Sequence, residues 1–92
     1  MRSKYIANVR KQLKYAKEQS DWHEIIGCYG ELIGYNEADR SAYLNRSKAY
    51  RNLAAEHSET HMQTQYTELA RDDYKRYREL LAEQRHGRPR ES

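Results

Sequence analysis

Apolar residues recur every three or four positions along the first third of the chain, which is the spacing of amphipathic helices. Residues 3–18 form one such segment, and residues 22–35 form a second. The apolar positions of the first segment are Ile6, Val9, Leu13 and Ala16. Those of the second are Trp22, Ile25, Ile26, Tyr29, Leu32 and Ile33. No alternating run rich in Val, Ile and Thr occurs, so we expect no strands.

Two more helical segments are expected after a polar turn at residues 36–39. A third helix is predicted from about Ser41 to Ala55, and a long fourth helix over about 64–84. The polar stretch 56–63 between them is interpreted as a loop or a frayed helix end. The expected inward positions of the third helix are Tyr43, Ser47, Tyr50, Leu53 and Ala54. Those of the fourth are Tyr66, Leu69, Ala70, Tyr74 or Asp73, Tyr77, Leu80 and Leu81.

Short polar links join these segments, and short links between helices favour antiparallel neighbours. Asp21 stands just before the second helix, where its side chain can cap the helix, and Glu24 has the spacing that closes a capping box with it. We therefore predict an all-α fold of four antiparallel helices in one domain over residues 1–84. The basic tail, residues 85–92, is predicted to be disordered.

Three segments resemble parts of a tetratricopeptide repeat, a helix-turn-helix unit of 34 residues. Residues 20–22 resemble the turn between its helices, residues 42–54 its first helix, and residues 70–77 its second. The matching residues of the first-helix segment are Tyr43, Asn45, Ser47 and Tyr50. This register divides the chain into units at about 6–39 and 40–84. The second unit then carries roughly eleven extra residues, around 55–65, between its helices.

The resemblance implies a role in binding other proteins. Solenoids of such units generally need about three of them to bury a continuous core, and this chain shows only two. Two units leave an apolar edge that the long fourth helix or a partner must cover. We therefore expect a protein–protein interaction module, a small adaptor or chaperone that binds a partner peptide or helix through its groove or its open edge.

Some tetratricopeptide proteins clamp the C-terminal carboxylate of a partner with Lys, Asn and Arg side chains from the first helices of their repeats. By this resemblance Arg10 matches a clamp lysine, Lys14 occupies a clamp asparagine position, and Asn45 matches a clamp asparagine. The remaining clamp bases belong to a third repeat, which this sequence lacks. Lys48 joins these three residues in a candidate partner-binding anion site, and Tyr15 adds a stacking ring. The alternative interpretation is a solvated basic face.

Three glycines, Gly27, Gly30 and Gly34, lie inside the second predicted helix at spacings of three and four. Each costs about 0.8–1 kcal/mol relative to alanine in a helix interior. We interpret them as a smooth strip that another helix approaches, from this chain or a second copy, with a merely weakened helix as the alternative. A self-assembling protein or homodimer is therefore a further hypothesis. The other predicted helix-packing residues are Tyr43, Tyr50 and Tyr74.

Charge is distributed unevenly, although the net charge is only +3. Residues 1–17 hold six bases and no acid, residues 18–84 are acidic overall, and residues 85–92 are basic again. A protein that coats nucleic acid generally spreads positive charge over one face, whereas here the bases are confined to the two ends. A nucleic-acid-associated protein that uses residues 1–17 and the arginine tail is therefore an alternative and not the leading hypothesis.

Candidate chemistry is sparse. His57 and His61 have the spacing of two metal ligands on one helix face but lack a third, and no orienting group accompanies Cys28 and His23. We expect no catalytic residue, no metal site and no cofactor, and so no enzyme. A single cysteine excludes an intramolecular disulfide. The chain has no secretory h-region at its start and no apolar run of ~18 residues, so we expect a cytoplasmic protein that does not span a membrane.

Overall fold

The computed structural model describes residues 2–86, in which four α-helices and no strands occur. The helices are α1 (Arg2–Gln19), α2 (Trp22–Tyr35), α3 (Arg40–Glu56) and α4 (Thr60–His86). The predicted all-α fold with a long last helix is confirmed. Arg85 and His86 belong to α4, so the prediction of a disordered tail is wrong for these two residues. The rest of that tail lies outside the described residues.

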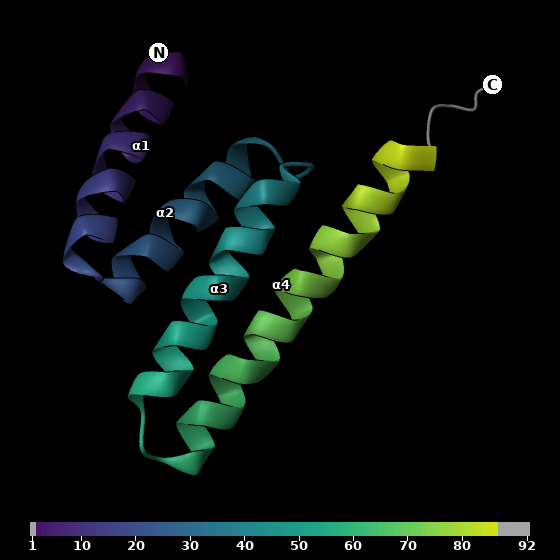
Figure 1. Ribbon diagram of the computed structural model, residues 1–92. Helices are drawn as coiled ribbons and strands as arrows, with labels where there is room; N and C mark the ends of the chain where they lie inside the picture. The colour runs from purple at the N-terminus through teal and green to yellow at the C-terminus, as the bar shows by residue number, and fades with distance from the viewer. Residues whose placement is uncertain (1, 87–92) are drawn as a thin grey trace.

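Each helix packs against its neighbours in sequence, and no other helix pair makes backbone contact in this part of the chain. Figure 1 shows the chain running alternately down and up through the four helices, so consecutive helices are antiparallel. The contact between α3 and α4 is the most extensive of the three. This order leaves α1 and α4 at the two edges of the array, each with a single helical neighbour.

A two-residue turn joins α1 to α2. Ser20 adopts the left-handed region at φ 53°, and its N–H donates to the Lys17 carbonyl at 3.1 Å. The Asp21 N–H donates to the Ala16 carbonyl at 2.9 Å, and the two bonds together form a Schellman motif that satisfies the end of α1. The Asp21 carboxylate also accepts the Glu24 N–H at 3.3 Å, so the predicted N-cap is confirmed. Because the Asp21 N–H is already bonded, Glu24 is not needed for a reciprocal capping box.

The link between α3 and α4 is shorter than the sequence indicates. Only residues 57–59 separate the two helices. The stretch 56–63, predicted as a loop or a frayed helix end, is therefore a link only at residues 57–59, and its other residues belong to helix ends. The prediction of about eleven extra residues between the helices, around 55–65, is wrong, because residues 60–65 belong to α4. The side-chain amide of Gln63 donates to the carbonyl of His57, and this bond ties the polar first turn of α4 to the link.

The buried core spans α1, α2 and α3 and continues along α3 and α4. Its main cluster contains Val9, Leu13, Ala16, Ile25, Cys28, Tyr29, Leu32, Ala42 and Ala49. Further buried residues of α3 and α4 are Ser47, Leu53, Ala54, Ala70, Asp73 and Leu80. The Ser47 hydroxyl donates to the Ala70 carbonyl at 2.9 Å, so two small residues let α3 and α4 approach closely.

Asp73, and not Tyr74, is the inward residue in the middle of α4. Asp73 is only 6% exposed, and its carboxylate accepts hydrogen bonds of 2.8 Å from both Nε and Nη2 of Arg46 on α3. Tyr74 is 40% exposed, and its ring lies beside that of Tyr77 on the same helix at a centroid distance of 5.6 Å. The prediction that Tyr74 packs between helices is therefore wrong, because the ion pair with Arg46 turns the Asp73 side of α4 inward.

Tyr43 and Tyr50 are half-buried on α3 and flank the Arg46 guanidinium, whose Cζ lies 5.9 and 6.0 Å from their ring centroids. Such contacts are favourable cation–π interactions. Tyr50 also stacks on Tyr66 of α4, with ring centroids 6.3 Å apart, and burial raises the pKa of its phenol. Both tyrosines therefore pack beside the Arg46 side of the Arg46–Asp73 ion pair.

The glycine strip of α2 is largely open to solvent. A Cβ atom at Gly27 or Gly34 would meet no atom within 4 Å, whereas one at Gly30 would lie 3.6 Å from Nη1 of Arg46. Within residues 2–86, Gly27 and Gly34 therefore do not serve close helix packing, which corrects the prediction for a helix of the same chain, whereas packing against a second copy stays a prediction. Only Gly30 faces a neighbouring helix, and it does so through the Arg46 side chain.

Replacing Gly27 by alanine is expected to raise the free energy of unfolding by about 0.8–1 kcal/mol, because alanine favours the helix and its methyl group enters open space. Urea denaturation followed by circular dichroism measures this change. Gly30→Leu is the matched contrast, since its side chain meets Arg46 and is expected to lower stability. A destabilised Gly27→Ala variant with a lower oligomeric mass would instead show that this position packs against a second copy.

Candidate functional site

A groove lies between α1 and α3, with α2 behind it. Its central hollow has a volume of about 260 Å³ and is lined by Lys17, Trp22, Tyr29, Asn45, Lys48, Ala49 and Asn52. Tyr29 and Ala49 are buried and form an apolar floor, whereas Lys48 and Asn52 are exposed at the rim. We call this surface the α1–α3 groove. It combines an aromatic floor with basic and amide side chains at its opening.

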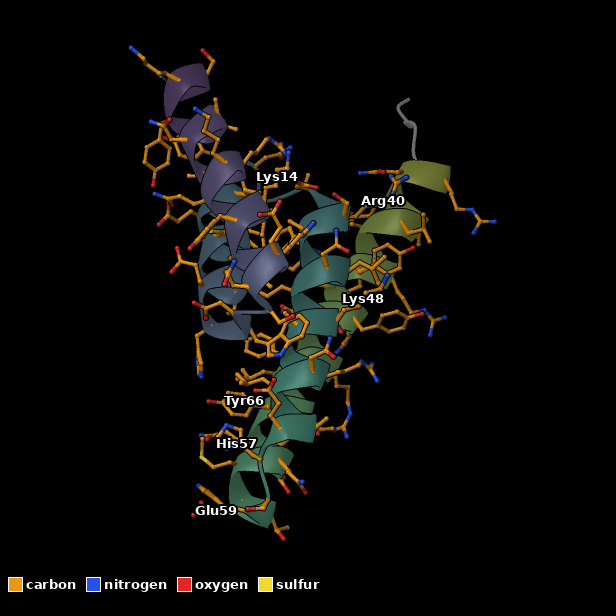
Figure 2. All side chains as sticks on the ribbon, turned by 60° about the vertical axis from the view of Figure 1, so that its left-hand side comes forward. Lys14, Arg40, Lys48, His57, Glu59 and Tyr66 are labelled. Atoms are coloured by element: carbon orange, nitrogen blue, oxygen red, sulfur yellow. The ribbon has the colours of Figure 1, made fainter. Side chains whose placement is uncertain are left out.

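Helical spacing places the polar residues on both sides of the α1–α3 groove. Arg10, Lys14 and Lys17 are four and three positions apart, so they share one face of α1, and Lys17 lines the hollow itself. On α3, the same kind of spacing aligns Asn45, Lys48 and Asn52. Figure 2, in which α1 comes forward, shows Lys14 on α1 and Lys48 on α3.

The rim of the groove is positively charged and holds no internal counter-ion. Within residues 2–86, neither its two lining bases, Lys17 and Lys48, nor Arg10 and Lys14 on the same face of α1 take part in an ion pair. The Lys17 ammonium lies 5.7 Å from the centroid of the Tyr29 ring, a cation–π contact that keeps it over the floor. These cations are therefore open to an anionic group from outside the chain, and charge-assisted hydrogen bonds to such a group are strong.

A hydrogen bond fixes one end of the groove. The indole N–H of Trp22, at the start of α2, donates to the Glu56 carboxylate at the end of α3 at 2.7 Å. This bond joins the start of α2 to the end of α3 beside the hollow. It also engages Glu56, the acid that is closest in sequence to the groove residues of α3. The Asn52 side chain donates to the Lys48 carbonyl at 2.9 Å, so its amide is oriented along α3.

Two of the five predicted partner-binding residues line the hollow, and two others share one face of α1 with a third lining residue. Asn45 and Lys48 line the hollow, and Arg10 and Lys14 share the face of α1 that carries Lys17 to it. Tyr15 does not belong to this set: it is 66% exposed and lines a separate hollow of about 470 Å³ between α1 and the start of α2. The inclusion of Tyr15 is corrected, because one helical step turns a side chain by about 100° away from its neighbour.

Sequence reasoning missed part of the groove. Lys17, Trp22, Tyr29 and Asn52 line it but were not predicted as partner-binding residues. Spacing could have added Lys17, three positions after Lys14, and Asn52, four positions after Lys48. No local pattern distinguishes a floor tyrosine such as Tyr29 from an ordinary core residue.

The remaining chemistry-bearing residues are engaged in packing. Burial, followed by the nearby Glu24 carboxylate, raises the pKa of the Cys28 thiol, so this thiol stays protonated and is a poor nucleophile. The rings of His23 and His57 lie 6.4 and 5.3 Å from that of Tyr66. In the described part of the chain, no group of three or more His, Cys, Asp or Glu residues is placed to hold a metal ion.

Comparisons of the chain with protein-family models, with curated proteins and with solved structures find no match. Over residues 2–86, no helix is both long and apolar enough to cross a bilayer. A functional proposal therefore rests on the geometry and charge of the α1–α3 groove.

Proposed function

We propose that this chain is a non-catalytic protein-interaction module, a small adaptor or chaperone of the cytoplasm, that binds an anionic segment of a partner protein in the α1–α3 groove. The observation that carries the proposal is a basic rim without internal ion pairs over an aromatic floor. Carboxylate groups of a partner would accept hydrogen bonds from the lysines. An apolar side chain beside them would cover Tyr29.

The dimensions of the groove favour a peptide over a small-molecule cofactor. The hollow of about 260 Å³ is smaller than the roughly 300–1,000 Å³ of typical ligand pockets, so it suits one side chain or one terminal carboxylate. Arg10 and Lys17 are separated by about 10 Å along α1 at 1.5 Å per residue. An extended peptide covers that distance with about three residues.

The resemblance to tetratricopeptide repeats supports the same assignment. In that family the first helices of the repeats line the peptide groove, and α1 and α3 would be the first helices of the two units here. The close contact of Ser47 and Ala70, both about 1% exposed, joins α3 and α4 as one helix-turn-helix pair. The resemblance therefore supports a peptide-binding role for the residues that flank the α1–α3 groove.

Reversing two groove charges provides the test. We expect Lys17→Glu combined with Lys48→Glu to weaken binding of a fluorescent glutamate-rich peptide by about a hundredfold, since two charge-assisted hydrogen bonds contribute roughly 1.5 kcal/mol each. The matched control is Lys4→Glu combined with Lys11→Glu, which changes net charge equally on another face of α1. Fluorescence anisotropy titrations of the three proteins measure the difference.

Two results would contradict the proposal. Equal weakening by the control variant would show that net charge, and not the groove, attracts the peptide. Undiminished binding of a lysine-rich peptide of the same length would show that the groove does not select anions. Amidation of the C-terminal carboxylate of the acidic peptide separates recognition of the chain end from recognition of side-chain carboxylates.

A further inference from the structure

Ion pairing divides the exposed surface of α4 into two chemically different sides. On one side, Nη1 of Arg76 lies 3.2 Å from a Glu79 oxygen and 3.9 Å from a Glu83 oxygen. On the other side, Arg71, Lys75 and Arg78 are exposed and take part in no ion pair among the described residues. Arg76 engages Glu79 and Glu83, and the exposed acids Glu68 and Asp72 lie on the same side of α4 by helical spacing, so the side of Arg71, Lys75 and Arg78 carries more bases than acids.

The unpaired bases share one face of α4 with an exposed aromatic ring. Arg71, Lys75 and Arg78 are four and three positions apart, and Tyr74 lies between them. A shallow hollow of about 550 Å³ is lined by Arg71, Tyr74, Lys75, Arg78, Glu79 and Ala82. Tyr74 is 40% exposed, and its ring is tilted by 39° against that of Tyr77. We call this surface the α4 basic face.

The charge of the opposite edge argues against a second copy as its occupant. In Figure 1, α4 forms one edge of the helical array and α1 the other. Copies stacked edge to edge would bring the α4 basic face against α1, which carries exposed Lys4 and Lys11 and has no acid before Glu18. Like charges at such an interface repel, so the α4 basic face selects a partner of negative charge.

We propose that the α4 basic face binds single-stranded nucleic acid. Surfaces of this class combine cations that follow the phosphate backbone with aromatic rings on which bases stack. Here Arg71 and Arg78, about 10 Å apart along α4, would contact phosphates, and Tyr74 would stack on a base between them. The proposal is independent of the peptide groove, because the two surfaces share no residue.

The direct test is anisotropy of a fluorescent oligouridine of about twelve nucleotides, titrated with the full chain at roughly 50 mM salt and upward. We expect binding that weakens linearly on a logarithmic salt scale. Arg71→Gln combined with Arg78→Gln should lower affinity at least tenfold and reduce the salt slope by about 1.4, or about 0.7 for each lost phosphate contact. Tyr74→Leu should lower affinity about fivefold or more and leave the salt slope unchanged.

Lys4→Gln combined with Lys11→Gln is the matched control, since it removes the same charge from the other edge of the array. It should lower the affinity for the oligouridine less than Arg71→Gln combined with Arg78→Gln does. Absence of binding at low salt, or equal weakening by the control, would overturn the proposal. A double-stranded competitor that displaces the oligouridine as well as an unlabelled single strand does would also contradict the proposal. So would displacement by polyglutamate together with unchanged oligouridine affinity of the Tyr74→Leu variant. Each variant should keep its helices, because Arg71, Tyr74 and Arg78 are all exposed. Circular dichroism of each variant checks this.

Discussion

Replacing Asp73 by alanine is expected to lower the free energy of unfolding by about 3 kcal/mol, because it leaves the Arg46 guanidinium without its partner in a half-buried site. The two groups form two hydrogen bonds of 2.8 Å, and the Asp73 carboxylate raises the pKa of Arg46. We place the effect at the lower end for buried ion pairs since the Arg46 side chain is 23% exposed. A chain of 92 residues has roughly 5–14 kcal/mol of stability in total, so this is a large share.

Urea denaturation measures the loss, and an exposed ion pair on the same helix supplies the control. Glu79→Ala removes the carboxylate 3.2 Å from Arg76, where both side chains are more than 40% exposed, and should cost less than about 1 kcal/mol. A double variant, Arg46→Met with Asp73→Leu, should recover most of the lost stability, because it leaves no charge unpaired. If Asp73→Ala cost no more than Glu79→Ala, the ion pair would not hold α3 against α4.

Replacing Ile25 by alanine is the second change with a large expected effect, a loss of about 3 kcal/mol. Ile25 is 3% exposed in the cluster that joins α1, α2 and α3. The deletion removes buried methyl and methylene groups and leaves a cavity that neighbouring side chains fill only in part. In a chain of this size, each kcal/mol lowers the melting temperature by about 4–8 °C.

Thermal melting of Ile25→Ala against Leu69→Ala checks this prediction. Leu69 is 39% exposed, so its truncation removes similar atoms from a solvated site and should change stability by about 0.5 kcal/mol or less. Because each helix packs only against its neighbours, the melt also reports cooperativity. A second transition in Ile25→Ala, with α3 and α4 still helical, would show that the two helix pairs fold independently. Unchanged melting would contradict the burial of Ile25.

The sequence allowed the four helices to be predicted because their signals are local. Apolar residues three or four positions apart indicate α1 and α2, and their bounds agree closely with the structure. Asp21 was predicted to cap α2, and its side chain accepts a backbone N–H at 3.3 Å. Asp39, predicted only as part of a polar turn, caps α3 at the same distance. The polar start of α4 was missed because it carries no apolar periodicity, and its first turn is tied down by Gln63 instead.

The candidate site was only half predictable. The resemblance to tetratricopeptide repeats grouped Arg10, Lys14 and Asn45, and Lys48 was added to them, but neither step could show that Lys17 and Tyr29 line the same hollow as Asn45 and Lys48. That arrangement depends on how α1 and α3 are rotated about their axes, which the packing of both against α2 decides. Local spacing carries no information on this rotation.

The sequence by itself determined an all-α chain with a basic first helix, because periodicity and charge are properties of neighbouring residues. Only the tertiary structure decided which side of α4 faces inward at its middle. On α4, Asp73 and Tyr74 are separated by one helical step, and a partner 27 positions away in the sequence, Arg46, turns the carboxylate inward and the ring outward. The same choice leaves Arg71, Lys75 and Arg78 unpaired on the outer side of the helix, in the part of the chain that the structure describes. Long-range ion pairing and packing therefore set the surfaces on which both proposals rest.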